Sequence, residues 1–310
     1  MLGLLLLLAA TLGGTVLTCL LDDDADLLWR VAAGVPLGAT VTFLVAYLLS
    51  CVMGLGQATL LLSLAVALWP LALLRRPAVR RTLASGLASL ARPGAVLVLV
   101  GVAGLAAFAG TACARAFFVR PEGIFVGDEH NFGDLGIHLA ITCDFLFGQR
   151  FPPENPSMSG ASLTYPFLTD FGAASLVMGG LPLRDAFFIE STVLFVALLV
   201  LLFCFTRQLA GESLAGGLAV VLFVFSGGLG WWAYLQDASR SGQGLMGHLF
   251  HLTRDYTIIG DAAQGLRWGN TVTTLLLTQR TLLLGLGLAL VVLALWWRAM
   301  RDSDSDRRPH

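Results

Sequence analysis

Long apolar runs, separated by short polar connections, make up most of the chain. A helix needs about 20 apolar residues to cross the hydrocarbon core of a membrane, because it rises about 1.5 Å per residue. By that length the pattern predicts about seven transmembrane helices, within residues 1–21, 31–53, 57–74, 94–118, 184–206, 213–235 and 271–297. We therefore expect an all-α fold, a polytopic membrane helical bundle.

Composition supports this class. The 310 residues are 56% hydrophobic and only 13% charged, about half the charge density of an average soluble domain, which excludes an ordinary soluble globule. The net charge is -1 and no basic stripe is interleaved with aromatic residues, so nucleic acid is not an expected partner. The five cysteines are scattered without a C-x-x-C pair, which favours a packing role.

The arginines predict the orientation. One group crowds a short connection at residues 75–92 and another follows the last helix at 298–308, and the positive-inside rule places both in the cytoplasm. The chain then divides into N-terminal transmembrane helices (1–118), an outer loop (119–183) and C-terminal transmembrane helices with a second outer loop and a cytoplasmic tail (184–310). We expect a multi-pass protein of the plasma (inner) membrane, with its N-terminus and main loops outside. Residues 1–21 lack a basic start and a cleavage site, which indicates a retained helix.

The outer loop is expected to be ordered and to carry interfacial helices. One helix is predicted from Asp134 to Phe147, and prolines at 152, 153 and 156 stiffen the turn after it. The apolar run 166–180, with Asp170 inside it, is too short to span, so we interpret it as an interfacial or re-entrant helix.

Acidic residues open this loop. Asp128 and Glu129, followed by His130, come directly after a membrane helix, and two neighbouring carboxylates repel each other. They are either solvated at the membrane surface or part of a site in which one carboxylate acts as a general base. Asp134 has a structural alternative as a helix cap, and His138, four residues later on the same helical face, is its expected partner.

These motifs resemble a known superfamily. The string D-E-x-x-F-G (Asp128 to Gly133) after a membrane helix is similar to the first outer loop of the GT-C glycosyltransferases, closest to the protein O-mannosyltransferase and lipid-A aminoarabinose transferase group. The longer pattern resembles large bacterial membrane proteins grouped with that superfamily. It comprises G-D-L-x-x-H-L from Gly133, F-P-P-E-N-P from Phe151, Y-P-F-L-T-D from Tyr165, W-G-N from Trp268 and Q-R at Gln279 and Arg280.

The resemblance covers roughly residues 94–297 and implies a function. Such an enzyme transfers a sugar from a polyprenyl-phosphate donor to a lipid or cell-envelope acceptor, with Asp128 as the base and Glu129 beside it. The mannosyltransferase pattern has a histidine where this chain has Asn131, which leaves Asp134 as a rival for the base. Members usually carry several more helices, so the likeness is to the N-terminal part of such an enzyme.

Arg280 lies where an apolar segment begins, and a charged residue inside a span costs about 2.5 to 3.5 kcal/mol on insertion scales. It either snorkels to the headgroups or binds the donor phosphate, to which its planar fork is suited. Glu190 is a further buried acid with no partner that the sequence identifies. The candidate substrate-binding residues are His130, His138, Tyr165, Arg254, Arg267, Gln279 and Arg280.

The second outer loop contains H-x-x-H at His248 and His251, but a zinc site normally needs three protein ligands, so no metal site is predicted. No cofactor is expected with certainty, and a divalent cation is left open. Arg254 and Arg267 are either rim groups for an anionic head or solvated. Two other functions stay open, a transporter or lipid flippase and a noncatalytic membrane protein. Charges clustered near the outer surface rather than at the midplane disfavour a transporter.

Overall fold

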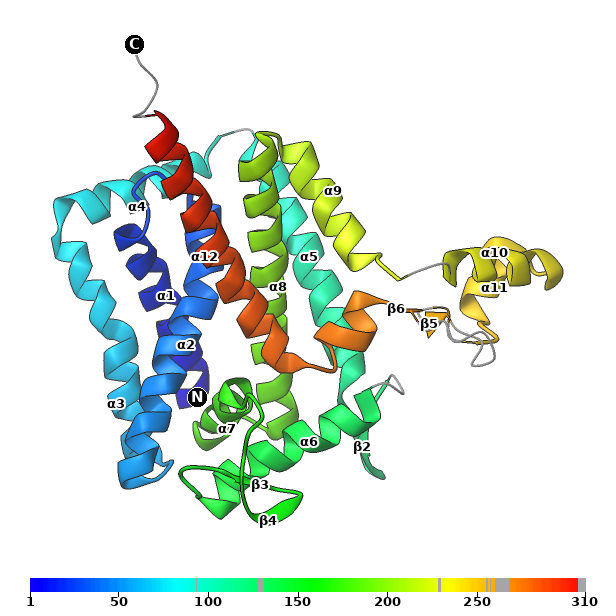
Figure 1. Ribbon diagram of the computed structural model, residues 1–310, viewed down its shortest axis with the longest axis horizontal. Coiled ribbons are helices and arrows are strands. Elements are labelled where there is room, and N and C mark those ends of the chain that lie inside the picture. The colour runs from blue at the N-terminus through cyan, green and yellow to red at the C-terminus, as the bar shows by residue number, and fades with distance from the viewer. Residues whose placement is uncertain are drawn as a thin grey trace.

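The computed structural model describes residues 1–92, 94–127, 131–227, 230–254, 256, 258–259 and 268–305. Figure 1 shows a bundle of roughly parallel and antiparallel helices, with short helices and hairpins at one end and a small lobe at one side. The strands described form three short antiparallel pairs: β1 (Phe118–Arg120) with β2 (Gly123–Phe125), β3 (Glu154–Asn155) with β4 (Met158–Ser162), and β5 (Ile258–Ile259) with β6 (Trp268–Gly269). The prediction of an all-α bundle is confirmed.

Six helices in the described part of the chain are long and apolar enough to cross a membrane. Many large apolar side chains point outward, such as Leu97 at 78% exposure, as expected for helices that face lipid. The chain is therefore a membrane protein. The six are α1 (Leu2–Leu17) with η1 (Thr18–Leu20), α2 (Leu27–Met53), α3 (Gln57–Leu68) with η2 (Trp69–Arg75), α5 (Ala95–Ala116), α8 (Leu183–Ala210) and α12 (Arg280–Ser305).

The seventh expected span, residues 213–235, is wrong in its extent. Helix α9 (Ser213–Val224) has 12 residues and ends where Phe225, Ser226 and Gly227 begin a turn. Asn270 stabilises that end, because its side-chain amide donates to the carbonyls of Val224 (2.9 Å) and Ser226 (2.6 Å). At 1.5 Å per residue α9 is about 18 Å long, short of a hydrocarbon core of about 30 Å.

The two ends of the bundle differ in composition. One end, here the arginine-rich end, carries the exposed helix α4 (Pro77–Ser89) and the C-terminal part of α12 (Figure 1). The first predicted arginine group and the described part of the second, in the C-terminal turns of α12, therefore lie at the same end of the bundle. Chain connections are tied there by ion pairs from Asp22 to Arg298 and from Asp26 to Arg207. Asp26 also caps α2 by accepting from Trp29 N at 2.8 Å.

The opposite end, here the loop end, is built by α6 (Asn131–Cys143), the π-turn η3 (Asp144–Gly148) and α7 (Leu168–Met178). The predicted helix from Asp134 to Phe147 is confirmed as α6 with η3. Every residue of α7 from Thr169 to Leu176 is buried, so this helix is enclosed by protein and does not lie flat on a surface. The N-terminus lies at this end, since Gly3 N donates to Gly179 O at 3.0 Å.

Helix α8 is central and packs against α2, α5, α7, α9 and α12. Helices α1 and α2 approach closely through small residues. A Cβ atom on Gly38 would lie 1.8 Å from Ala10 O, and one on Gly14 would lie 2.0 Å from Gly34 O. Such contacts are a usual basis of helix association in membranes. The side lobe contains α10 (Gly230–Arg240) and α11 (Gly244–Phe250), and η5 (Val272–Leu276) leads back to α12.

Candidate functional site

Arg280, the first residue of α12, lies buried at the loop end, where it makes three side-chain bonds. Its Nη1 donates to Asp170 Oδ1 at 3.1 Å, and its Nη2 donates to Glu190 Oε2 at 2.8 Å. Its Nε donates to Ser191 Oγ at 3.1 Å. The guanidinium also lies over the Phe187 ring, 3.7 Å from the ring centroid. The arginine that the sequence placed at a membrane boundary is thus fully engaged inside the protein.

Asp170 connects Arg280 to His138. Both carboxylate oxygens of Asp170 lie 2.9 Å from His138 Nδ1, and the Asp170 carbonyl accepts a bond from Thr142 Oγ1 at 3.3 Å. His138 and Asp170 have no exposed surface. The expected pairing of His138 with Asp134 is therefore wrong: α7 packs against α6 and presents a closer carboxylate. We call His138, Asp170, Glu190 and Arg280 the buried cluster.

A glycine makes room for this cluster. Helix α7 crosses α8 at Gly172, where a Cβ atom would lie 2.3 Å from Glu190 Oε1 and 2.7 Å from the Phe43 ring. Because Glu190 Oε1 and His138 Nε2 are buried without a hydrogen-bond partner, the cluster holds two further polar atoms in a low-dielectric interior. Two carboxylates, one arginine and one histidine thus share one buried hydrogen-bonded group.

Tyr165 and Gln279 lie beside the buried cluster. The Tyr165 hydroxyl donates to Gln279 Oε1, and the Tyr165 ring meets His138 edge to face at a centroid distance of 5.7 Å. Burial, followed by the negative charges of Asp134 and Asp170, raises the pKa of Tyr165 above its ordinary value. Tyr165 is therefore a neutral donor at physiological pH. Asp134 is half-buried in the first turn of α6, where a carboxylate meets the positive end of the helix dipole.

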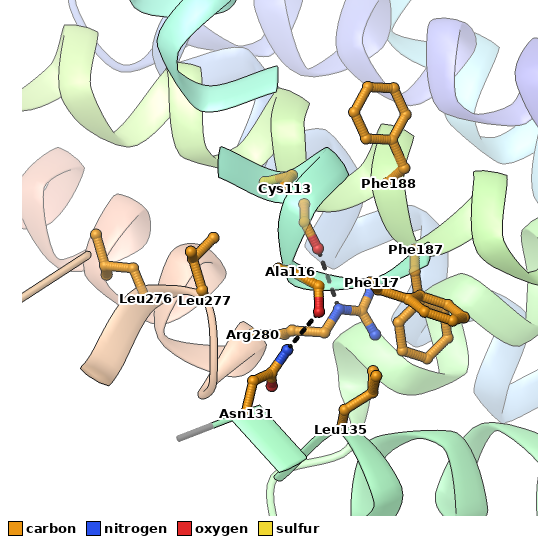
Figure 2. Close-up of a pocket in the computed structure, with 11 residues that line it drawn as sticks. Cys113, Ala116, Phe117, Asn131, Leu135, Phe187, Phe188, Leu276, Leu277 and Arg280 are labelled. Carbon is orange, nitrogen blue, oxygen red and sulfur yellow. Dashed lines mark hydrogen bonds between the residues drawn. The ribbon is translucent and has the colours of Figure 1, made fainter. Parts of the chain in front are cut away.

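A small pocket lies next to Arg280, between α5, α6, α8 and η5, as Figure 2 shows. Its volume of about 30 Å³ is enough for a water molecule. Asn131, at the start of α6, closes one side and donates from Nδ2 to Ala116 O at 3.1 Å. The pocket therefore has a polar side formed by Arg280, Ser191 and Asn131, and its other lining residues are Cys113, Ala116, Phe117, Leu135, Phe187, Phe188, Leu276 and Leu277.

A larger groove adjoins this pocket on the flank of the bundle, between α5 and the chain around α9 and η5. Its volume is about 370 Å³, and Ala116 and Leu277 line both cavities. Gly127 lines the groove and Asn131 lines the pocket, and in the sequence these two residues flank the segment 128–130, which holds Asp128 and Glu129. The lining of the groove is largely apolar: Phe108, Ala112, Arg115, Ala116, Gly127, Val224, Phe225, Asn270, Val272, Thr273 and Leu277.

Arg254 lies away from these cavities, in the lobe of α10 and α11. It is exposed and pairs with Asp237 at 2.9 Å, and the Tyr256 hydroxyl donates to the same Asp237 oxygen at 2.8 Å. The bond from Tyr256, together with the positive charge of Arg254, lowers the pKa of Asp237. His248 Nε2 lies 2.9 Å from the Tyr256 hydroxyl, so this histidine belongs to a local hydrogen-bonded group.

The structure thus brings together Asp134, His138, Tyr165, Gln279 and Arg280 and leaves Arg254 apart. Asp128, Glu129, His130 and Arg267 lie outside the described residues. Within the part of the chain that is described, no three His, Cys, Asp or Glu side chains are arranged to hold a metal ion. The sequence indicated no role for Asp170 or Ser191 and no partner for Glu190. Asp170 and Glu190 each stand inside an apolar run, and a carboxylate in that position is the pattern that could have identified them as site residues.

No family model, curated protein or solved structure matches the chain.

Proposed function

We propose that this membrane protein is a GT-C-like glycosyltransferase that transfers a sugar from a polyprenyl-phosphate donor to an acceptor at the loop end. The observation that supports the proposal most is where Gly127 and Asn131 lie, the residues on either side of the segment 128–130. Gly127 lines an apolar groove open to the flank of the bundle, and Asn131 belongs to the polar side of the adjoining pocket. A lipid-linked sugar needs an apolar surface for its chain and polar groups close by for its head.

The proposed reaction is a displacement at the anomeric carbon. An acceptor hydroxyl oxygen bonds to that carbon while the bond to the lipid phosphate oxygen breaks, and the phosphate keeps the electron pair. Asp128 takes the hydroxyl proton, and Glu129, His130 and Asp134 support the base or the acceptor. The leaving phosphate is already an anion, so the step needs no strong general acid. The acceptor is a lipid or another cell-envelope component.

In this proposal Arg280 does not bind the donor phosphate, the role that the sequence suggested for it. The Arg280 guanidinium already pairs with two buried carboxylates, which compensate its single positive charge. We therefore assign Arg280 and His138 to positioning α6, α7, α8 and α12 around the pocket. We assign Tyr165 and Gln279, which hydrogen-bond each other beside the buried cluster, to contact a sugar hydroxyl.

The proposed location is the plasma (inner) membrane, with the loop end outside. It is supported by the meeting of α4 and the end of α12 at the arginine-rich end, which the positive-inside rule assigns to the cytoplasm. Labelling of single introduced cysteines by a membrane-impermeant thiol reagent in intact cells tests it, on a background in which Cys51, the exposed native cysteine, is replaced by serine. A cysteine at Ser159 of the loop end should react, and one at Ser85 of α4 should not.

The test of function is sugar transfer by the full chain in proteoliposomes, with a radiolabelled polyprenyl-phosphate sugar and membrane acceptors. Asp128→Asn should lower the rate by about 10² to 10⁴-fold, the range that a positioned base contributes. Glu212→Gln is the matched control, because Glu212 is an exposed carboxylate at the N-cap of α9, and its rate should equal that of the unaltered chain. An equal rate for Asp128→Asn would move the base to Asp134, and no transfer by the unaltered chain would reject the proposal.

The alternative function, transport of a solute or lipid, is favoured by one observation, the buried cluster itself. Ionisable groups enclosed within a membrane bundle are common in proton-coupled transporters. Proton uptake driven by a substrate gradient in proteoliposomes would distinguish the two functions. The alternative predicts that Glu190→Gln abolishes uptake, whereas the glycosyltransferase proposal predicts no coupled proton movement.

A further inference from the structure

The groove beside α5 has a single charged side chain among its described lining residues, that of Arg115. Arg115 lies in the last turn of α5 and is exposed. Its position near a helix C-terminus is favourable for a cation, but that interaction leaves the guanidinium fork unused. No ion pair joins Arg115 to any residue that the structure describes. An exposed guanidinium beside an apolar surface, with no carboxylate partner among the described residues, is suited to bind an anion.

The rest of the groove determines what kind of anion fits. Phe108 and Ala112 of α5 form one wall, and Val224, Phe225 and Leu277 form the other. An apolar cavity of about 370 Å³ on the flank of a membrane bundle is suited to a hydrocarbon chain. The occupant that satisfies both the walls and Arg115 is a lipid with an anionic head. A phosphate suits the planar, bidentate guanidinium.

We propose that Arg115 binds the phosphate of a lipid phosphate whose chain lies in the groove between α5 and α9. This inference rests on the proposed function and identifies the residue that holds the donor. Arg115 is available for a phosphate, whereas Arg280 already bonds two buried carboxylates. Ala116, the residue after Arg115, lines both the groove and the polar pocket. A phosphate at Arg115 therefore lies beside this pocket and beside Gly127, the residue that precedes Asp128.

The test is binding of polyprenyl phosphate to the purified full chain in detergent, measured by native mass spectrometry. Arg115→Gln removes the charge and should weaken binding about tenfold, the equivalent of one charge-assisted hydrogen bond. Arg120→Gln is the matched control, because Arg120 is also exposed but stacks on Phe118 and Phe125 and does not line the groove. Binding by Arg120→Gln should be unchanged. Equal binding by Arg115→Gln and the unaltered chain would overturn the inference.

Further binding measurements test the contributions of the lipid's phosphate head and of its chain separately. Ala112→Trp places a large side chain in the groove and should also weaken polyprenyl phosphate binding about tenfold, with an unchanged melting temperature as evidence of folding. Polyprenol, which lacks the phosphate, should bind the unaltered chain and Arg115→Gln equally. Inorganic phosphate that displaces the lipid at equal concentration would show a site for the head alone and would contradict the role of the groove.

This binding assay contains neither sugar nor acceptor, so its result is separate from that of the transfer assay. Lipid phosphate bound through Arg115 by a chain that transfers no sugar would reject the proposed function and keep the binding site. Sugar transfer with the same donor KM in Arg115→Gln and the unaltered chain would reject the binding site and keep the function.

Discussion

The two ends of the bundle use ion pairs in different ways. At the loop end, Arg280 and Asp170 pair with exposures of 6% and 0%, and three helices besides α12 contribute to the buried cluster. At the arginine-rich end, Arg207 and Asp26 pair with exposures of 33% and 44%. Charges held in a low-dielectric interior depend on their partners, whereas exposed charges are also solvated by water. The buried pairs of the loop end therefore constrain the fold, and the exposed Arg207–Asp26 pair contributes little.

The largest effect is expected for Asp170→Asn. The substitution leaves Arg280 with Glu190 as its remaining carboxylate and replaces the ionic partner of His138 by an amide. Removing one partner of a buried ion pair typically costs about 3 to 5 kcal/mol. The melting temperature of the purified protein in detergent, followed by circular dichroism, should fall strongly.

The control for this variant is Asp185→Asn, because Asp185 is 44% exposed in its pair with Arg184 at the start of α8. Its melting temperature should stay close to that of the unaltered chain. A similar small change for Asp170→Asn would mean that the buried cluster does not hold the helices together.

The second largest loss of stability is expected from filling the space that Gly172 leaves beside the buried cluster. Gly172→Ala adds a Cβ atom 2.3 Å from Glu190 Oε1 and 2.7 Å from the Phe43 ring, so the Glu190 carboxylate and the Phe43 ring must shift or α7 must move away from them. Overpacking of this kind costs about 1 to 3 kcal/mol. Thermal unfolding of Gly172→Ala and Gly217→Ala gives the comparison, since a Cβ atom on Gly217 of α9 has no neighbour within 4 Å. The Gly217 variant should be neutral or more stable by up to about 1 kcal/mol, because alanine favours a helix. Equal melting temperatures for the two would contradict the close crossing.

The buried cluster shows how far the sequence could predict the site. The cost of a charge in an apolar segment indicated that Arg280 needs a partner, but its partners Asp170 and Glu190 lie 110 and 90 residues away. Only the packing of α7 against α8 brings them together. Local spacing favoured Asp134 as the partner of His138, and a tertiary contact prevailed.

The fold, too, was predictable where it depends on local sequence and not where it depends on distant contacts. Apolar run length predicted six long helices and the short helix α7, because length and composition are local properties. It overestimated α9, because the apolar residues after Val224 include a turn that Asn270 stabilises from 46 residues away. The prediction fails where a residue distant in sequence supplies the hydrogen bonds.

A small effect is expected at the arginine-rich end. Arg207→Gln removes the ion pair with Asp26 but leaves Asp26 able to cap α2. An exposed pair of this kind contributes about 0 to 1 kcal/mol. Raising the salt concentration should reduce even this difference, because mobile ions screen exposed charges. Melting temperatures of both chains at low and high salt check it. A loss as large as that of Asp170→Asn would remove the distinction between the two ends.

The smallest effect is expected in the lobe of α10 and α11, which lacks a buried ion pair among its described residues. The bond from Tyr256 and the charge of Arg254 lower the pKa of Asp237, so the folded lobe binds this proton less readily than the unfolded chain. The resulting stabilisation is fully present above the unfolded pKa of about 3.9 and is lost as the pH falls through the lower pKa of the folded state. Hydrogen exchange in residues 244–250 should therefore become faster, relative to its intrinsic rate, only below about pH 4. Asp237→Asn, which cannot titrate, should show no such step. A step that persists in Asp237→Asn would assign the acid sensitivity to another group and leave Asp237 without a stabilising part in the lobe.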